Sequence, residues 1–223
     1  MTPGPRADAV AREQAVVLSY PSTMGAAFRK PYVTFADYLE AEQSGDVKHE
    51  WFNGAVYAMS RGTPEHARLS AQVVWVIRNS LPRDCNVYSS DLMLYVAEVQ
   101  LSTYADATVV CSQLETITVK RNGKSLGEGV TNPTVIIEVL SESTERYDRE
   151  EKFAYFRTLP SLQEYVLVSQ DERAIEVFRR PSSPASSAAL PGARWECDTA
   201  RAGGTITIHG CAIEVDAIYG ARD

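Results

Sequence analysis

The sequence predicts an α+β fold with layered α/β character, in which a mixed β-sheet is flanked by helices. Three observations predict it. A chain of 223 residues with 44% hydrophobic content can bury one sizeable core, so a single domain is the default. Short β-branched runs alternate along the chain with amphipathic segments of helical period. The run at 134–140 is apolar on both faces, as is typical of a strand covered on both sides.

The N-terminal part predicts a tail, a helix and an extra hairpin. Residues 1–30 are expected to form a tail or a peripheral strand, and the single domain is expected over 31–223. Thr34 is typical of a helix N-cap, with Asp37 in the first turn. Asn53-Gly54 between two apolar runs is a strong hairpin signal, so we expect a hairpin before the main sheet.

The remaining helices and strands are predicted from the spacing of apolar residues and from the capping residues and prolines at their ends. Thr63-Pro64-Glu65 begins a second helix, whose apolar stripe ends near Pro82. A third helix is expected at 144–159, closed by a proline. Residues 181–194 are of low complexity and predict a flexible loop. Strands are expected at 87–96, 104–111, 134–140, 165–168, 174–178, 205–208 and 212–215.

The composition excludes several classes of protein. No apolar stretch approaches the roughly 20 residues that a membrane span needs, and no secretory signal is visible. The four cysteines lack CxxC spacing and the three histidines lack ligand spacing, which argues against a zinc site and favours reduced thiols in a cytoplasmic protein. The net charge of -7 argues weakly against a protein that coats nucleic acid, but it allows an enzyme with a local basic groove.

Glu138 is the most informative residue, because it stands alone in the apolar run at 134–140. An unpaired carboxylate in an apolar medium costs several kcal/mol, so Glu138 needs a cation, a metal ion or a catalytic role. Asp106 opens the preceding strand, and if the two strands pair, both carboxylates can point to the same side. Two close carboxylates repel unless a cation joins them, and oxygen ligands suit Mg²⁺ or Mn²⁺.

Lys152 falls within the apolar stripe of the expected third helix, about 40° from Asp148 at 100° per residue. A lysine that faces a sheet is costly unless it is paired or catalytic. The spacing by itself favours a structural ion pair of Lys152 with Glu138 or Asp148 over a metal site. From its position alone, Glu50 is expected to be a solvent-facing residue of the hairpin. His66 is expected to be a structural histidine near the start of a helix.

A longer block of sequence favours the metal site over the structural ion pair, because it resembles the Uma-type family of restriction endonucleases in the PD-(D/E)XK nuclease superfamily. The block runs from Thr131 to Ser141 and continues through Tyr147-Asp148 and Lys152 to Glu164-Tyr165. Three shorter segments upstream also match the family. Tyr104-Ala105-Asp106 resembles the family's Pro-Asp strand, and His49-Glu50 with Gly54 resembles the family's hairpin. Glu65-His66 resembles the start of the family's first core helix. The resemblance extends over residues 33–180.

The resemblance implies a restriction-endonuclease-like core and a particular site. In that site Asp106 and Glu138 would hold a metal ion, with the Val139 carbonyl as a further ligand. The superfamily's lysine usually lies two residues after the glutamate, where this chain has Leu140. Lys152 on the following helix would then supply the ammonium group.

The implied function is metal-dependent hydrolysis of DNA phosphodiester bonds by a cytoplasmic, restriction-type endonuclease that uses Mg²⁺ (or Mn²⁺). Glu50, His66 and Asp148 are auxiliary candidates, Asp148 as an i, i+4 partner that holds Lys152. A homodimer would suit cleavage of both strands. The alternative is a catalytically silent nuclease fold that serves as a binding or scaffold protein, which the acidic balance and the lack of a Lys/Arg run favour. The complete set of Asp106, Glu138 and Lys152 favours the nuclease.

Overall fold

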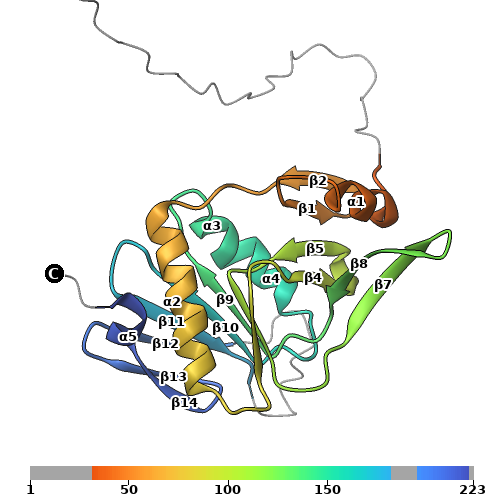
Figure 1. The fold of residues 1–223 in the computed structure, drawn as a ribbon. Helices are drawn as coiled ribbons and strands as arrows, with labels where there is room; N and C mark the ends of the chain where they lie inside the picture. The colour runs from red at the N-terminus through yellow and green to blue at the C-terminus, as the bar shows by residue number, and fades with distance from the viewer. Residues whose placement is uncertain (1–31, 182–194, 221–223) are drawn as a thin grey trace, which may run out of the picture. The chain divides into compact units, whose positions relative to one another are not determined.

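The computed structural model describes residues 32–181 and 195–220. The tail expected at 1–30 and nearly all of the loop expected at 181–194 lie outside the described residues. Within the described residues, the strands form two six-stranded sheets and one two-stranded sheet, with helices packed against them (Figure 1). The α+β class predicted from the sequence is confirmed.

The first sheet has the strand order β2-β1-β5-β4-β8-β7. Its strands are β1 (His49–Phe52), β2 (Ala55–Ala58), β4 (Met93–Val96), β5 (Leu101–Tyr104), β7 (Thr116–Arg121) and β8 (Lys124–Val130). Helix α1 (Phe35–Glu42) covers part of this sheet, because its Tyr38 and Leu39 bury against Trp51 and Leu126. The Thr34 hydroxyl accepts a hydrogen bond from the Asp37 amide, as a helix N-cap does.

The second sheet has the order β12-β11-β10-β9-β6-β3. Its strands are β3 (Asn86–Ser89), β6 (Ala107–Val110), β9 (Val135–Val139), β10 (Glu164–Val168), β11 (Ala174–Arg179) and β12 (Glu196–Arg201). Strands β9 and β10 are parallel, and β9 pairs with β6 in the antiparallel sense, so the sheet is mixed. The strands β13 (Thr205–Ile208) and β14 (Cys211–Glu214) form a separate hairpin.

Helices cover both faces of the second sheet, which explains why β9 is buried along its whole length. On one face lie α2 (Pro64–Ser80) and α5 (Val215–Tyr219), in a core with Val109, Val135 and Ile137. On the other face lies a helical segment made of α3 (Glu145–Tyr147), a π-helical turn (Asp148–Lys152) and α4 (Phe153–Phe156). Figure 1 shows α2 and this segment on opposite sides of the sheet.

The turns at Asn53-Gly54 and Asn122-Gly123 join β1 to β2 and β7 to β8. All four turn residues have positive φ, between 44° and 86°, as a type I′ turn requires. Asparagine and glycine tolerate this conformation, so these dipeptides set the register of both hairpins.

Two strands expected from the sequence are wrong as single strands. The run expected at 87–96 divides into β3 and β4, and the run expected at 104–111 divides into β5 and β6. In both cases the two halves join different sheets. Side-chain alternation indicates that a segment is extended, but it does not indicate which sheet the segment joins. Strand β12 and helix α5 were not predicted, and the helix expected at 144–159 ends at Phe156 and contains the π-helical turn.

The structure pairs Cys85 and Cys111 in a disulfide bond, so the expectation of reduced thiols is wrong for these two residues. Cys197 and Cys211 are free thiols. The paired cysteines are 26 positions apart, but they adjoin the ends of β3 and β6, which run side by side. The argument for a cytoplasmic location therefore loses its support from cysteine usage. Among the described residues, no helix is long and apolar enough to cross a membrane.

Candidate active site

Asp106 and Glu138 meet at the end of two neighbouring core strands. The register of β6 and β9 sets Ala107 opposite Ile137, so the next positions outward, Asp106 and Glu138, also face each other. The Asp106 amide donates a hydrogen bond of 3.4 Å to Glu138 Oε2. The Val139 amide donates one of 2.8 Å to Asp106 Oδ2. Asp106 lies where the chain leaves β5 in one sheet and enters β6 in the other, so the crossover fixes its position.

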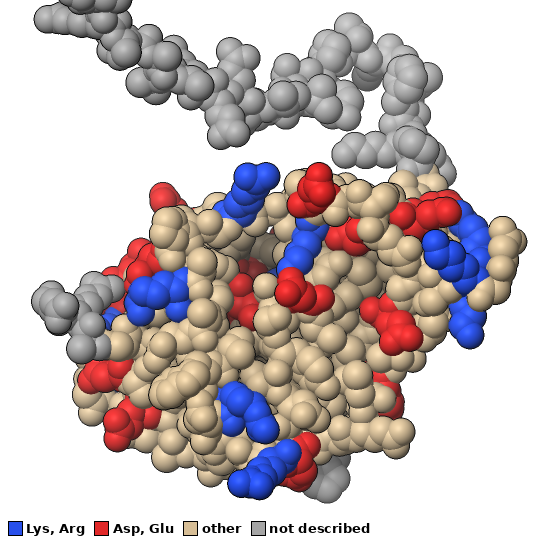
Figure 2. Space-filling model, in the orientation of Figure 1, with Lys and Arg blue, Asp and Glu red and all other residues tan. Residues whose placement is uncertain are grey.

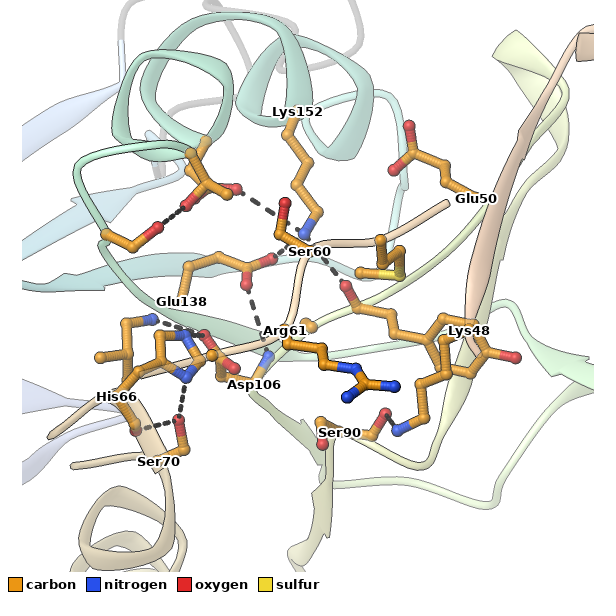
Figure 3. Close-up of a pocket in the computed structure, with 18 of the residues that line it drawn as sticks. Lys48, Glu50, Ser60, Arg61, His66, Ser70, Ser90, Asp106, Glu138 and Lys152 are labelled. Carbon is orange, nitrogen blue, oxygen red and sulfur yellow. Dashed lines mark hydrogen bonds and ion pairs between the residues drawn. The ribbon is translucent and has the colours of Figure 1, made fainter. Parts of the chain in front are cut away.

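Lys152 reaches this pair from the helical segment on the facing side (Figure 3). Its Nζ lies 2.8 Å from Glu138 Oε1, 3.7 Å from Asp148 Oδ1 and 3.0 Å from the Tyr104 carbonyl oxygen. Asp148 and Lys152 are the first and last residues of the π-helical turn. Residues four apart are neighbours on one face of a helix, and π-helical turns are frequent at functional sites.

Three carboxylates and one ammonium group share this buried region. Burial raises the pKa of Glu138 well above its usual value, Asp148 and Asp106 raise it further, and Lys152 lowers it. Burial also raises the pKa of Asp148. Burial by itself would lower the pKa of Lys152, but the charges of Glu138 and Asp148 outweigh burial, and the net pKa is raised. Lys152 is therefore an ammonium ion at neutral pH, and the region has an excess of acidic groups that favours a further cation.

His66 joins the site from the first turn of α2. Its Nε2 lies 3.2 Å from Asp106 Oδ2, and the Ser70 hydroxyl lies 3.4 Å from its Nδ1. The hydrogen bond with Asp106 raises the pKa of His66, burial opposes this, and the Val139 carbonyl adds to the rise. His66 therefore contacts Asp106, one of the groups that the sequence singled out as metal ligands. The side chain is tied to the site and is not a histidine of the helix core.

Glu50 enters the site from β1, and hydrogen bonds fix its position. The Thr103 hydroxyl donates to Glu50 Oε2 at 2.7 Å, and the Tyr147 hydroxyl donates to Glu50 Oε1 at 2.5 Å. Burial raises the pKa of Tyr147, so its hydroxyl stays a donor at neutral pH. Glu50 is therefore held by side chains from the first sheet and from α3, and it is not the solvent-facing residue that its position in the hairpin suggested.

A cavity of about 1170 Å³ brings these residues together. It is lined by all six side chains that the sequence singled out: Glu50, His66, Asp106, Glu138, Asp148 and Lys152. Figure 2 shows a hollow on this face, with basic side chains beside its mouth and acidic side chains within and around it. Figure 3 shows Arg61 and Lys48 in the same cavity.

Sequence reasoning missed four contributors to the cavity. The Tyr104 carbonyl has no signal in the sequence, because every residue carries the same group. Lys48 and Arg61 are isolated cations in polar segments, and Lys48 pairs with Asp91 at 2.7 Å. Tyr147 directly precedes Asp148, and the hydrogen bond it gives to Glu50 depends on a contact between residues 97 positions apart.

The donor atoms fit a hard cation that keeps part of its water shell. Apart from its ion pair with Lys152, Glu138 Oε1 has no hydrogen-bond partner among the described residues. The carboxylates here do not form a cluster of three mutually close His, Cys, Asp or Glu ligand atoms in the described part of the chain. An ion would therefore need the Val139 carbonyl, water and substrate oxygens as further ligands. Mg²⁺ is commonly bound in this way, through one or two carboxylates.

Two acidic residues at the ends of adjacent core strands meet a lysine from the facing helical segment, and this α+β arrangement is that of a restriction-endonuclease-like fold. A crystal structure described as "a putative nuclease belonging to DUF820", from Anabaena variabilis, has a similar fold, with a TM-score of 0.58 and 16% sequence identity. The similarity covers 78% of this chain and 91% of that chain.

The model of the Uma2 family, described as "Putative restriction endonuclease", matches residues 35–205, and the chain therefore belongs to this family. Two uncharacterized proteins of Synechocystis sp. (strain ATCC 27184 / PCC 6803 / Kazusa) are similar to it. One is 34% identical over 151 residues, which cover 67% of this chain and 75% of the relative. The other is 29% identical over 149 residues, which cover 66% and 81%.

Proposed function

We propose that this protein is an endonuclease that hydrolyses DNA phosphodiester bonds with the help of Mg²⁺ or Mn²⁺. The observation that carries the proposal is the buried group of Asp106, Glu138 and Lys152 on the wall of a large cavity. Membership of the Uma2 family supports the nuclease class. The oxygen donors and the excess of acidic groups support the requirement for a divalent cation.

In this proposal Asp106, Glu138 and the Val139 carbonyl hold the ion. When bound, the ion polarises the scissile phosphate and lowers the pKa of a coordinated water. Lys152 donates a hydrogen bond toward the reacting phosphate and stabilises the charge that develops on its oxygens. Because its neighbours raise its pKa, Lys152 acts as a charged donor and not as the base.

The auxiliary residues hold this arrangement in position. Asp148 forms an ion pair with Lys152 at 3.7 Å and keeps the ammonium group directed toward Glu138. Arg61 and Lys48 line the cavity and are suited to contact the phosphates that flank the scissile bond. Such contacts position the strand without reading its sequence, so the cavity by itself implies no sequence preference.

One active site cuts one strand, and a second copy of the chain would supply the site for the other strand. We therefore expect a symmetric homodimer during cleavage of a duplex, because a two-fold axis matches the symmetry of the DNA backbone. Sedimentation of the protein with a short duplex tests this expectation, and cleavage of both strands in one binding event by a strictly monomeric protein would contradict it.

The second candidate function is a silent nuclease fold that binds a partner without cutting it. The net charge of -7 favours this alternative, because an acidic protein is repelled by the phosphate backbone. A silent fold, however, has no need for a lysine and three carboxylates buried in one cavity. The buried charged side chains thus favour the nuclease, whereas the net charge of the protein favours the silent fold that binds a partner.

Cleavage of supercoiled plasmid in Mg²⁺, in Mn²⁺ and in EDTA separates the two functions. The nuclease proposal expects nicking in either metal and none in EDTA. Asp106→Asn and Glu138→Gln should each lower the rate by roughly 10³-fold or more, because each removes a ligand charge at the reacting phosphate. Glu128→Gln, on the exposed part of β8, is the matched control and should cut like the parent. Metal-independent cutting, or no cutting by a folded parent in either metal, would reject the proposal.

A further inference from the structure

A second group of ligand atoms lies away from the carboxylates of the cavity. Cys85, Cys111 and His209 each offer one ligand atom, and these atoms all lie within 4.8 Å of one another. The three residues come from the segment after α2, from the end of β6 and from the β13–β14 turn. In the described part of the chain they form the only group of three such atoms of His, Cys, Asp or Glu.

Strand register places the two cysteines together. Asn86 pairs with Val110, so Cys85 and Cys111, one position further on, face each other with their Cα atoms 3.9 Å apart. The Cys111 amide donates to the Thr134 hydroxyl at 3.1 Å. Each cysteine thus directly adjoins a strand, Cys85 before β3 and Cys111 after β6, and the pairing of these strands fixes the positions of the two residues.

His209 is held over this pair by a strained turn. It has a φ of 47° at the tip of the β13–β14 hairpin, a conformation that costs a non-glycine residue about 1 kcal/mol or more. Its amide donates a hydrogen bond of 2.6 Å to Glu164 Oε2. Its imidazole has no hydrogen-bond partner among the described residues, although the side chain is partly buried. A partly buried imidazole without a partner, beside two sulfur atoms, is available for a ligand.

We propose that Cys85, Cys111 and His209 form a redox-controlled binding site for a thiophilic divalent cation such as Zn²⁺. Two thiolates and one imidazole are ligands that Zn²⁺ prefers, with Zn–S near 2.3 Å and Zn–N about 2.0–2.1 Å. Tetrahedral bonds of these lengths set the ligand atoms roughly 3.5–4 Å apart, which lies inside the observed limit of 4.8 Å. Three protein ligands leave a fourth position for water or an outside ligand.

The redox state decides whether the site can bind. In the disulfide the sulfur electrons are shared in the S–S bond, and no thiolate is available. A dithiol reductant delivers two electrons and two protons, breaks the S–S bond and becomes a disulfide itself. Binding of the cation to the resulting thiols then releases two protons, one from each sulfur. Hydrogen peroxide reverses the change, because it accepts two electrons and leaves as two molecules of water while the S–S bond forms again.

The site lies at the opposite end of the strands from the proposed active site. Cys111 follows the last residue of β6, whereas Asp106 precedes its first residue. The disulfide links the segment after α2 to the end of β6. The cation would link these same two segments and also the β13–β14 hairpin. Binding here and catalysis at the carboxylates are therefore separate properties, and either can fail without the other.

Cobalt provides the test, because Co²⁺ substitutes for Zn²⁺ and its bonds to thiolates absorb strongly in the near ultraviolet. The full chain is reduced with a phosphine, desalted without oxygen and titrated with Co²⁺. The proposal expects one equivalent of Co²⁺ with a thiolate absorption band, which Zn²⁺ displaces and which the peroxide-treated protein lacks. Carboxylate-bound Co²⁺ at the active site gives no such band, so Asp106→Asn should leave the band unchanged.

Variants assign the ligands. Cys85→Ser and Cys111→Ser should each abolish the two-thiolate band, and His209→Ala should weaken Co²⁺ binding by at least about tenfold. Cys197→Ser, at an exposed free thiol, is the matched control and should keep the band. If a cysteine variant fails to fold, alkylation of the thiols in the reduced parent protein tests the same ligands. Zn²⁺ should then protect two of the four thiols of the reduced parent from alkylation. Absence of the band in the reduced parent, its survival in Cys85→Ser, or alkylation of all four thiols with Zn²⁺ present would overturn the proposal.

Discussion

The ammonium group of Lys152 offers the sharpest test of the active-site geometry. Lys152→Met keeps most of the apolar stem and removes the charge. The change deletes contacts of 2.8 Å to Glu138, 3.0 Å to the Tyr104 carbonyl and 3.7 Å to Asp148. It leaves two carboxylates and one carbonyl oxygen in a region where Glu138 is 3% exposed and Asp148 4% exposed.

Two magnitudes follow from this geometry. Removing one partner of a buried ion pair typically costs about 3–5 kcal/mol of stability, because the remaining charge loses its counter-ion. Removing a charged donor from the reacting phosphate should lower the single-turnover rate by roughly 10³-fold, equivalent to about 4 kcal/mol in the activation free energy. The variant should therefore be both less stable and much slower than the parent.

A double-mutant cycle with Glu138→Gln separates the ion pair from general damage to the core. Glu138→Gln should also destabilise the metal-free protein, because it removes the nearest counter-ion of Lys152, but it should cost less than Lys152→Met, since Asp148 remains 3.7 Å from Nζ and burial already disfavours the ionised form of Glu138. In the double variant neither unpaired charge remains, so the two changes should be coupled by about 1–3 kcal/mol. Urea unfolding of the four proteins without metal measures this coupling.

The rate is measured in single-turnover cleavage at saturating Mg²⁺, at a temperature at which the variant is folded. Lys124→Met, at an exposed position of β8, is the control for loss of a lysine and should leave both rate and stability unchanged. An undiminished rate in folded Lys152→Met would remove Lys152 from the reaction. Additive stability effects in the cycle would refute the ion pair itself.

Three further changes test the framework around the site. Tyr147→Phe removes the 2.5 Å hydrogen bond to Glu50 and should cost about 1.5–3 kcal/mol in urea unfolding, and an unchanged midpoint would mean that this bond adds no stability. Arg149→Lys replaces a two-point contact with Glu176, at 2.8 Å and 2.8 Å, and should cost about 0.5–1 kcal/mol, with high salt reducing the difference. Leu69→Ala, at a fully buried position of α2, should lower the free energy of unfolding by about 2–5 kcal/mol, and a smaller loss would indicate that α2 does not pack as described.

The sequence by itself determined the local elements whose signals are local. Thr34 and Thr63 begin helices because their hydroxyls can cap the first turn, and both do so in the structure. The Asn53-Gly54 pair specifies a hairpin because its backbone tolerates positive φ, and the structure has that hairpin between β1 and β2. Glu138 stood out because a carboxylate in a doubly buried strand needs a counter-ion, and the structure supplies Lys152 as that counter-ion.

The tertiary structure decided the features that depend on register and on the choice between two sheets. The chain crosses from one sheet to the other between β5 and β6, and this crossing sets Asp106 opposite Glu138. The π-helical form of the turn Asp148–Lys152 was also decided by the tertiary structure, because five residues are too few to show a period of their own, although the i, i+4 spacing already placed Asp148 and Lys152 on one helix face. The pairing of Cys85 with Cys111 also follows from strand register. Contacts between residues tens of positions apart are selected by the packing of the whole core, and local patterns in the sequence carry no record of that selection.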